Sequence, residues 1–409
     1  TIRARAGVFD TSVPRRFGLR TFEIPAEAGP GETLIRVRLA GVCGSDLHTF
    51  AGRADYGVVI PGHEIMGQIV SLGSGVVDAN GRPLKVGDRV VPESTLPCLQ
   101  CPDCRGYGSR LDKLVDYTAC EHYLLWGTIP LSDPVWMNGA YAEYLQAPAN
   151  GLLHRIDGDV TDEEAVLLEP LAVGVKAVLK AGVTLGHVVV VEGPGPIGLA
   201  CVVAASFAGA SQVIVTGMDC DRGRLELARE LGATETICVS EEDALEKLQG
   251  LTGGRRAERV IDTTGALPAF DLGLKLTARN GVYTCIGGYP KGTILPVPQE
   301  YCLRNKIDIR FSHNGTNCYQ AAYRIVRSRR FPLHKMVTHR YPLERAQEAL
   351  EDLSRREGGH VKVVLECERE RDEYGQFESG RRAGVHHAAG RHRDGRLGIA
   401  PGIEPGRPR

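Results

Sequence analysis

The chain has 409 residues, a formal net charge of -1 at neutral pH and 24% charged residues. This length favours two domains over one core, and a hydrophobic content of 43% is typical of a water-soluble globular protein. The balanced charge gives no basis for binding nucleic acid or a membrane surface. Twelve cysteines without a signal-peptide pattern indicate reduced thiols, so we expect a cytoplasmic location and no membrane partner.

The first third of the chain predicts short strands separated by turns. Segments 34–42, 66–73 and 87–94 combine strand-forming residues with Gly, Pro or Ser at their ends. This is an all-β, GroES-like pattern rather than an alternation of strands and helices.

Four cysteines follow these strands with the spacing of a metal site. Cys98, Cys101 and Cys104 are separated by two residues each, which lets short turns bring several thiolates to one ion, and Cys120 comes after a longer gap. Four thiolates leave no open position on a tetrahedral zinc ion, so such a site stabilises a loop and does no chemistry.

A second group of possible ligands is mixed in type and spread along the chain. Cys43 lies in a Gly-flanked turn, His63 and Glu64 follow a proline, and Glu169 lies at a helix boundary. Cysteine, imidazole and carboxylate suit zinc, and three protein ligands leave a position for water or substrate. Each residue alone is more often structural, so the prediction depends on their joint occurrence.

The middle of the chain changes to a pattern of alternating strands and helices. Segment 163–182 has helical periodicity, and 187–219 is consistent with strand, glycine loop, helix and strand. The unbroken run of valines before the loop indicates a parallel strand buried on both faces. The loop matches G-x-G-x-x-G, whose glycines allow a dinucleotide pyrophosphate to approach the backbone at the helix N-terminus. The loop residues that we expect to contact the cofactor are Gly193, Gly195, Pro196, Ile197 and Gly198.

In this order, the segments GVCGSDLH, GHE, the four-cysteine lobe, EPLAVG and GPGPIG resemble the zinc-containing medium-chain dehydrogenase/reductase family. Glu169 stands where classical alcohol dehydrogenases have a second cysteine ligand, so the chain looks like the sorbitol, polyol and threonine dehydrogenase branch. The resemblance implies that Cys43, His63 and Glu169 bind a catalytic zinc, with Glu64 as a fourth ligand or a supporting group. It also favours Cys120 as the fourth structural ligand, although the gap before it contains an insertion at 106–117.

The resemblance implies a fold and a domain organisation. We expect an α/β protein with a GroES-like β-rich catalytic domain at 1–168 and 317–367, and a Rossmann dinucleotide-binding domain at 169–316. The tail at 368–409 has few large apolar residues, and we expect it to be disordered. Membership of the family also suggests a homodimer or homotetramer.

The implied reaction is hydride transfer from an alcohol to a nicotinamide cofactor, with zinc acting as a Lewis acid. Ser45 is two residues from Cys43, near enough for its hydroxyl to bond the reacting oxygen. By resemblance, His48 passes the released proton to solvent. Asp46 is a candidate to orient a zinc-binding histidine.

The choice between NAD and NADP stays open at this stage. Gly217 ends the second strand, where NAD-specific members carry an acid. Asp219 is a substitute partner for the ribose hydroxyl, whereas Arg222 or Arg224 could pair with a 2'-phosphate. We favour NAD slightly. Thr264, Ile286 and Gly287 are further candidates for contact with the cofactor.

The favoured function is oxidation of a secondary alcohol, such as a polyol, sugar or cyclitol, to a ketone, with two zinc ions per chain. The nearest enzymatic alternative is a threonine-type amino-alcohol dehydrogenase. An alternative of another class is a zinc- and cofactor-binding protein without turnover.

Overall fold

The computed structural model describes residues 1–106, 116–355 and 359–368. Most of the predicted insertion at 106–117 lies outside the described residues. The prediction of disorder for the tail also falls outside them, except for Glu368. This residue pairs with Arg36 and Arg38.

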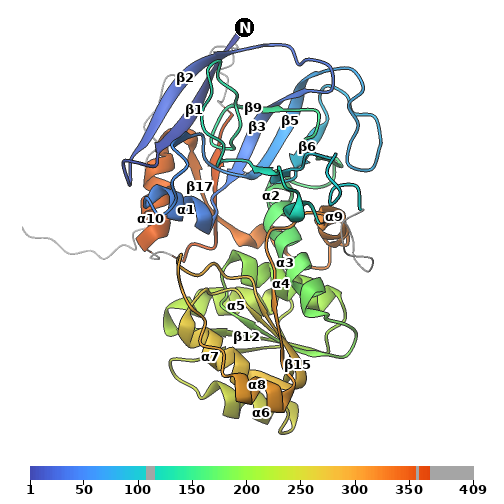
Figure 1. Ribbon diagram of the computed structural model, residues 1–409, viewed down its shortest axis with the longest axis vertical. Coiled ribbons are helices and arrows are strands. Elements are labelled where there is room, and N and C mark those ends of the chain that lie inside the picture. The colour runs from blue at the N-terminus through green and yellow to red at the C-terminus, as the bar shows by residue number, and fades with distance from the viewer. Residues whose placement is uncertain (107–115, 356–358, 369–409) are drawn as a thin grey trace, which may run out of the picture. The chain divides into compact units, whose positions relative to one another are not determined.

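Strand β3 (Thr33–Gly41) is central to the larger sheet of the first domain among the described residues, which is antiparallel except for the parallel pair β17–β18. On one side it pairs with β5, and on the other with the late strand β18, so the chain returns to this sheet after the Rossmann-type segment (Figure 1). The sheet contains β5 (Glu64–Leu72), β6 (Arg89–Pro92), β9 (Tyr144–Ala147), β10 (Leu153–Ile156), β17 (Val337–Pro342) and β18 (Lys362–Glu366).

Smaller elements flank this sheet. Helix α1 (Gly44–Phe50) follows β3 directly, and α10 (Ala346–Arg355) lies between β17 and β18 in sequence. The small sheets consist of β1 (Ile2–Asp10), β2 (Phe17–Ile24) and β4 (Val58–Val59), and of β7 (Thr95–Leu96) with β8 (Leu124–Leu125).

The second large sheet is parallel, with strand order β13-β12-β11-β14-β15-β16 among the described residues. Its valine-rich strand β11 (Val188–Glu192) packs Val189 and Val191 into one core cluster and Val188 and Val190 into another. This agrees with the prediction of a strand buried on both faces. The other strands are β12 (Gln212–Gly217), β13 (Glu235–Cys238), β14 (Ala257–Asp262), β15 (Thr277–Cys285) and β16 (Asp308–Phe311).

Helices cover both faces of the parallel sheet, as Figure 1 shows for its green and yellow segments. Residues of α3, α4 and α9 belong to the first core cluster, and residues of α6, α7 and α8 belong to the second. These helices are α3 (Leu168–Ala181), α4 (Pro196–Phe207), α5 (Arg222–Glu230), α6 (Ala244–Thr252), α7 (Leu267–Leu276), α8 (Gln299–Asn305) and α9 (Tyr319–Arg327).

The helix predicted at 163–182 is divided into α2 (Asp162–Val166) and α3, which begins at Leu168. Pro170 explains the division, because it has no N–H to donate to the carbonyl of Val166 in a continuous helix. The interruption makes Glu169 a first-turn residue of α3. Across the described residues, no helix combines the length and apolar character needed to cross a membrane.

Candidate active site

Three possible metal ligands from two neighbouring strand ends meet in one place. Cys43 caps α1 directly after β3, whereas His63 precedes β5 and Glu64 begins it. One donor atom from each residue lies within 4.8 Å of the others. Since β3 and β5 are paired, with Gly41 opposite Glu64, the sheet register itself brings these residues together.

Asp46 holds the Cys43 turn in shape. Its Oδ2 accepts hydrogen bonds from the Cys43 backbone N–H at 2.9 Å and from the Tyr141 hydroxyl at 3.0 Å. Its Oδ1 lies 3.9 Å from Nδ1 of His63, beyond hydrogen-bond length. Burial opposes the charge on His63, but Cys43 and Asp46 outweigh it and raise the pKa of His63 well above its ordinary value. The groups around His63 therefore favour a positive charge at this position.

Glu64 has a buried partner that the sequence analysis did not identify. The Lys362 ammonium lies 2.6 and 2.7 Å from the two Glu64 oxygens, and both side chains are almost completely buried. Burial opposes the Lys362 charge, but the Glu64 carboxylate outweighs this effect and raises the lysine pKa. Lys362 comes from β18, so only the return of the chain to the first sheet reveals the pair.

Glu169 lies near this group but is not a member of it. Its carboxyl is buried, which raises its pKa to about 7, while the opposing charge of His63 lowers it. Glu64 and Lys362 also act on Glu169 electrostatically. The structure thus brings Cys43, His63 and Glu64 together and leaves the buried Glu169 carboxylate close enough to feel their charges but outside the group.

Ser45 and His48 both lie on α1, one and four residues after its first position, and both are exposed. Burial of part of the ring and the charge of Arg53 lower the pKa of His48. A neutral imidazole can accept a proton and release it to solvent, as a proton carrier must.

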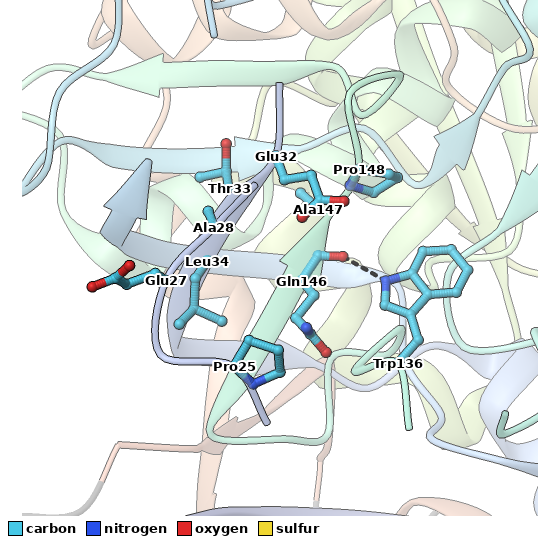
Figure 2. Close-up of a pocket in the computed structure, with 10 residues that line it drawn as sticks. All are labelled: Pro25, Glu27, Ala28, Glu32, Thr33, Leu34, Trp136, Gln146, Ala147 and Pro148. Atoms are coloured by element: carbon cyan, nitrogen blue, oxygen red, sulfur yellow. Dashed lines mark hydrogen bonds between the residues drawn. The ribbon is translucent and has the colours of Figure 1, made fainter. Parts of the chain in front are cut away.

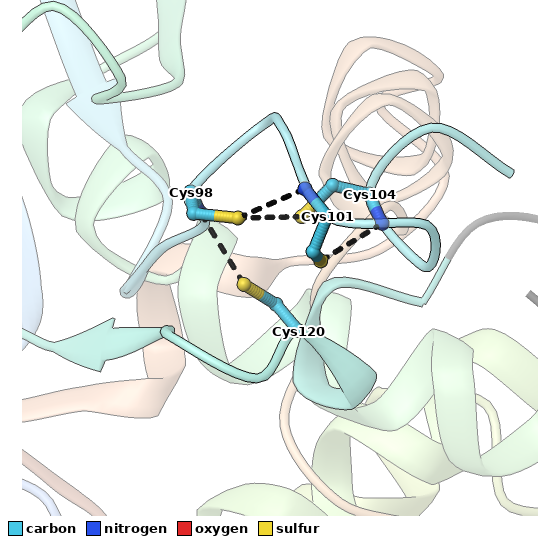
Figure 3. A group of neighbouring side chains, drawn as sticks. All are labelled: Cys98, Cys101, Cys104 and Cys120. Carbon is cyan, nitrogen blue, oxygen red and sulfur yellow. Dashed lines mark hydrogen bonds between the residues drawn. The ribbon is translucent and has the colours of Figure 1, made fainter.

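The four cysteines predicted as a closed site form one cluster (Figure 3). Their sulfur atoms lie within 4.8 Å of one another, and Cys120 lies with the other three despite the long gap before it. Backbone N–H groups point at the sulfurs: Cys101 donates to Cys98 at 3.3 Å and Cys98 donates to Cys120 at 3.3 Å. N–H groups of Gln100 and Cys101 lower the pKa of Cys98 to about 6, which favours a metal-binding thiolate.

The glycine loop has the shape that a pyrophosphate requires. Gly193 has a φ of +91°, and a Cβ on Gly198 would lie 1.9 Å from the Gly193 carbonyl oxygen. A Cβ on Gly195 would meet nothing within 4 Å, so the helix N-terminus is open at this point. Pro196 is the first residue of α4, and Ile197 follows it. These features match the three glycine positions of a dinucleotide-binding loop: one in the turn, one with open space at the helix N-terminus and one at the close helix–strand contact.

Gly217 has little room for a side chain, since a Cβ would lie 3.0 Å from Leu225 and 3.2 Å from Pro194. The backbone N–H of Asp219 donates to the Ser240 hydroxyl at 3.3 Å, next to the end of β13. Asp219 is the acid nearest in sequence to Gly217, which is the position where the resemblance places an acid in NAD-specific proteins.

Both arginines near the loop already have partners. Arg222 forms an ion pair with Glu241. Arg224 donates to the backbone carbonyl of His360 at 2.6 and 3.1 Å and contacts Asp221 at 3.3 Å. These contacts reduce the capacity of either arginine to bind a phosphate.

The remaining cofactor candidates lie at the ends of β14 and β15. Thr264 donates its hydroxyl to Asp262 at 2.6 Å. The N–H groups of Ile286 and Gly287 donate to the Asp262 carbonyl at 2.9 and 3.0 Å. Strand β14 pairs with β11, and β15 pairs with β14, all in parallel, so the candidates lie at the same end of the sheet as the glycine loop.

Two surface pockets lie apart from the candidate ligands. The one in Figure 2, of about 390 Å³, includes residues of β3 and β9, and the other has about 260 Å³. Neither contains a predicted site residue. The first is lined by Pro25, Glu27, Ala28, Glu32, Thr33, Leu34, Trp136, Gln146, Ala147 and Pro148.

Comparisons with known proteins agree with this architecture. Residues 29–157 match the alcohol dehydrogenase GroES-like domain, and residues 196–328 match the zinc-binding dehydrogenase domain. An erythritol/L-threitol dehydrogenase of Mycolicibacterium smegmatis is 34% identical over 364 residues, covering 86% of this chain and 95% of the relative. Sorbitol dehydrogenase of Gallus gallus is 34% identical over 350 residues, covering 84% and 91%. The crystal structure of an alcohol dehydrogenase from Thermotoga maritima superposes with a TM-score of 0.79 at 27% identity, covering 90% of this chain and all of that chain.

The chain belongs to the zinc-containing medium-chain dehydrogenase/reductase family, in the branch of the sorbitol and polyol dehydrogenases. It is an alcohol dehydrogenase that depends on zinc and a nicotinamide dinucleotide and acts on a small-molecule alcohol. The fold class is therefore confirmed, and the hypothesis of a binding protein without turnover is wrong. The thiolate, imidazole and carboxylate donors fit zinc, and the glycine loop fits a dinucleotide.

Proposed function

We propose that this enzyme oxidises a secondary alcohol of a polyol, sugar or cyclitol to a ketone, with NAD as the hydride acceptor. The observation that carries the proposal is the mixed donor group of Cys43, His63 and Glu64 beside Glu169. Similarity to dehydrogenases of erythritol, L-threitol and sorbitol supports a substrate with neighbouring hydroxyl groups.

We infer two zinc ions per chain. Cys43, His63 and Glu169 would hold the catalytic ion, with Glu64 as a further ligand or a nearby support. Cys98, Cys101, Cys104 and Cys120 would hold the structural ion. When bound, the catalytic zinc supplies a Lewis acid for the alcohol oxygen of the substrate.

The chain's own residues orient the substrate and remove its proton. Ser45 would take the hydroxyl proton of the substrate on its side-chain oxygen as it gives up its own hydroxyl proton, and His48 would carry the released proton to solvent from the exposed face of α1. The glycine loop would hold the pyrophosphate of the cofactor at the N-terminus of α4, and the bound cofactor would supply the hydride acceptor.

The charge around Asp219 supports NAD. Asp219, Asp221 and Glu241 bring three carboxylates to this loop, and Arg222 and Arg224 are engaged by other groups. A 2'-phosphate would add close to two negative charges beside these acids, whereas a ribose hydroxyl can donate to Asp219.

We also propose the domain limits 1–168 with 317–367 and 169–316, and a homodimer or homotetramer. Strand β16 is at the edge of the parallel sheet among the described residues and ends at Phe311, which is largely exposed, as are Ile294 and Leu303 in the preceding segment. An unpaired edge with exposed apolar side chains supports pairing with a second copy. The cytoplasmic location stays a prediction.

Turnover tests the proposal directly. We would follow NADH and NADPH formation with erythritol, threitol, sorbitol, xylitol, a cyclitol, L-threonine and ethanol, and measure zinc in the same sample. We expect two zinc ions per chain, polyol oxidation, and kcat/KM at least about tenfold higher with NAD. Asp219→Asn should reduce that ratio, because it removes the acceptor charge for the ribose hydroxyl.

The amino-alcohol alternative predicts a different profile. Preference for L-threonine over every polyol would replace the polyol assignment while leaving the metal and cofactor proposals in place. No turnover of any alcohol with either cofactor by zinc-loaded protein would overturn the assignment of the open site.

A further inference from the structure

A buried carboxylate joins two loops at the carboxyl end of the parallel sheet. Asp262 is the last residue of β14 and is completely buried. Its Oδ1 accepts hydrogen bonds from the Thr264 backbone N–H at 2.7 Å and from the Thr264 hydroxyl at 2.6 Å. Its Oδ2 accepts from the Tyr289 hydroxyl at 2.6 Å. One carboxylate therefore holds a residue of the loop after β14 and a residue of the loop after β15.

The backbone of Asp262 binds the same region, because its carbonyl accepts from the N–H groups of Ile286 and Gly287 at 2.9 and 3.0 Å. Hydrogen bonds to an ionised acceptor are about twice as strong as neutral ones. A residue with no exposed surface cannot touch a bound dinucleotide. Any role of Asp262 in cofactor binding therefore acts through Thr264, which is exposed, and Tyr289, which is half-buried.

The two loops are packed backbone against backbone. A Cβ on Gly287 would lie 2.3 Å from the Gly265 backbone nitrogen, and one on Gly265 would lie 2.4 Å from the Gly288 carbonyl oxygen. On the other side, a Cβ on Gly193 would lie 2.8 Å from the Thr264 methyl carbon. A shift of Thr264 would therefore disturb both the glycine loop and the loop after β15.

The strand order indicates which half of a dinucleotide these loops would meet. Strand β11 lies between β12 and β14 in the parallel sheet. A doubly wound sheet binds a dinucleotide across the point where the strand order reverses, with one mononucleotide on each side. Asp219 follows β12 and is the proposed partner of the adenosine ribose. The ends of β14 and β15 consequently lie on the nicotinamide side.

We propose that Asp262 is a positioning residue that fixes Thr264 and Tyr289 in the arrangement that the nicotinamide half of the cofactor binds. This inference rests on the proposed role of the glycine loop in dinucleotide binding and not on the choice between NAD and NADP. If the loops take this arrangement only part of the time, the apparent affinity falls by that fraction. Removing a hydrogen bond to a charged group changes an equilibrium constant about 10- to 100-fold.

The test measures cofactor affinity in the zinc-loaded, full-length protein without substrate. Fluorescence titration would give the dissociation constant of NADH, or of NADPH if wild type binds that more tightly. Competition would give the dissociation constant of AMP, or of 2'-phospho-AMP in the second case, since these carry only the adenosine half. We expect binding of the whole cofactor to be about 10- to 100-fold weaker in Asp262→Asn and about tenfold weaker in Tyr289→Phe. Binding of the adenosine half should stay within about twofold of wild type.

A double variant tests whether Asp262 and Tyr289 act through one bond. Asparagine keeps an acceptor for Thr264 but presents an uncharged amide to the Tyr289 hydroxyl. Asp262→Asn/Tyr289→Phe should therefore bind the cofactor about as weakly as Asp262→Asn alone, because coupled residues are not additive. Losses that multiply in the double variant would show that Tyr289 acts independently of Asp262 and would overturn the proposal.

Tyr301→Phe is the matched control for Tyr289→Phe, because it also removes a tyrosine hydroxyl from the second domain. That hydroxyl accepts from Arg256 at 2.7 Å, and Arg256 precedes β14, at the opposite end of the strand from Asp262. Its cofactor affinity should equal that of wild type. Equal losses in the two tyrosine variants, or equal losses for the whole cofactor and its adenosine half, would mean a general packing effect and would overturn the proposal.

Glu192→Gln is the matched control for the buried acid. Glu192 ends β11, lies opposite Asp262 in the register of the sheet and is also buried. Burial, and then the charge of Asp262, raise the pKa of Glu192 well above its ordinary value, so glutamine replaces a neutral acid of the same size. Its oxygens form no hydrogen bond with these loops in the part of the chain that the structure describes. Glu192→Gln should keep wild-type affinity, and a loss equal to that of Asp262→Asn would overturn the proposal.

The remaining outcomes separate the two proposals. If wild type binds neither NADH nor NADPH, the proposed dinucleotide site fails and this inference fails with it. If wild type binds, but Asp262→Asn and Tyr289→Phe stay within about twofold of it, only the role of Asp262 is overturned. If Asp262→Asn does not fold, Tyr289→Phe and Tyr301→Phe decide, since both keep their aromatic rings.

Discussion

The two candidate metal sites are built in opposite ways. The closed site draws its four cysteines from one stretch, 98–120, and backbone N–H groups within that stretch point at the sulfurs. The open site draws its donors from 43 to 169 and depends on side chains such as Asp46 and Lys362. A site supported by its own backbone should tolerate distant substitutions, whereas one supported by distant side chains should not.

The largest effect should follow loss of a ligand from the open site. Cys43→Ser should lower kcat/KM by at least about 1,000-fold, because the substrate oxygen loses its Lewis acid. Elemental analysis should find one zinc fewer per chain, with the circular dichroism spectrum unchanged. Full activity in this variant would exclude Cys43 from the catalytic site.

The next largest effect should follow the loss of Lys362, which comes from a distant segment of the chain and pairs with Glu64. Lys362→Met should destabilise the protein by about 3–5 kcal/mol, because it leaves the Glu64 carboxylate buried and unpaired. Urea unfolding would measure the change. The double variant Lys362→Met/Glu64→Leu should recover much of the loss. If the double variant is as unstable as the single one, the cost is not an unpaired charge.

Asp116 links the segment before Cys120 to helix α3, and its ion pair should contribute to stability. It accepts a hydrogen bond from the Thr118 N–H just before Cys120, and it pairs at 2.8 Å with Lys176 on α3, the helix that carries Glu169. Burial opposes its charge, but Lys176 and Thr118 outweigh this and lower its pKa to about 2 from an ordinary value of 3.8. Asp116→Asn should therefore cost about 2 kcal/mol of stability at neutral pH.

The direction of the pKa shift of Asp116 determines how the stability cost of Asp116→Asn varies with pH. A carboxyl with a lowered folded-state pKa stabilises the protein fully above about pH 4 and loses this contribution as the pH falls toward 2. The difference in unfolding free energy between wild type and Asp116→Asn should shrink between about pH 4 and pH 2. A constant difference over this range would show that the charge of Asp116 contributes nothing.

The smallest effect on turnover should come from the closed site. Cys98→Ala should remove one zinc per chain and lower the thermal unfolding temperature, but kcat per folded molecule should stay within about threefold of wild type. A loss of activity as large as that of Cys43→Ser would end the distinction between a structural and a catalytic site.

The sequence analysis was most successful where the chemistry is local. The spacing of Cys98, Cys101 and Cys104 and the glycines from 193 to 198 could be recognised because each motif forms within one turn of chain. The division of the helix at Leu167 was missed, although Pro170 carries the signal for it. Pro170 cannot donate a hydrogen bond to the Val166 carbonyl, and this interrupts the helix.

The sequence by itself determined the ligand types, the glycine loop, the parallel strand buried on both faces and the family. Those features depend on residue identity at fixed short spacings. Only the tertiary structure decided that Lys362 pairs with Glu64 and that Tyr319 and Asn314 hydrogen-bond to Ser94. These partners come from segments far along the chain, and their burial and register exist only after β18 has paired with β3 and α9 has packed against α3.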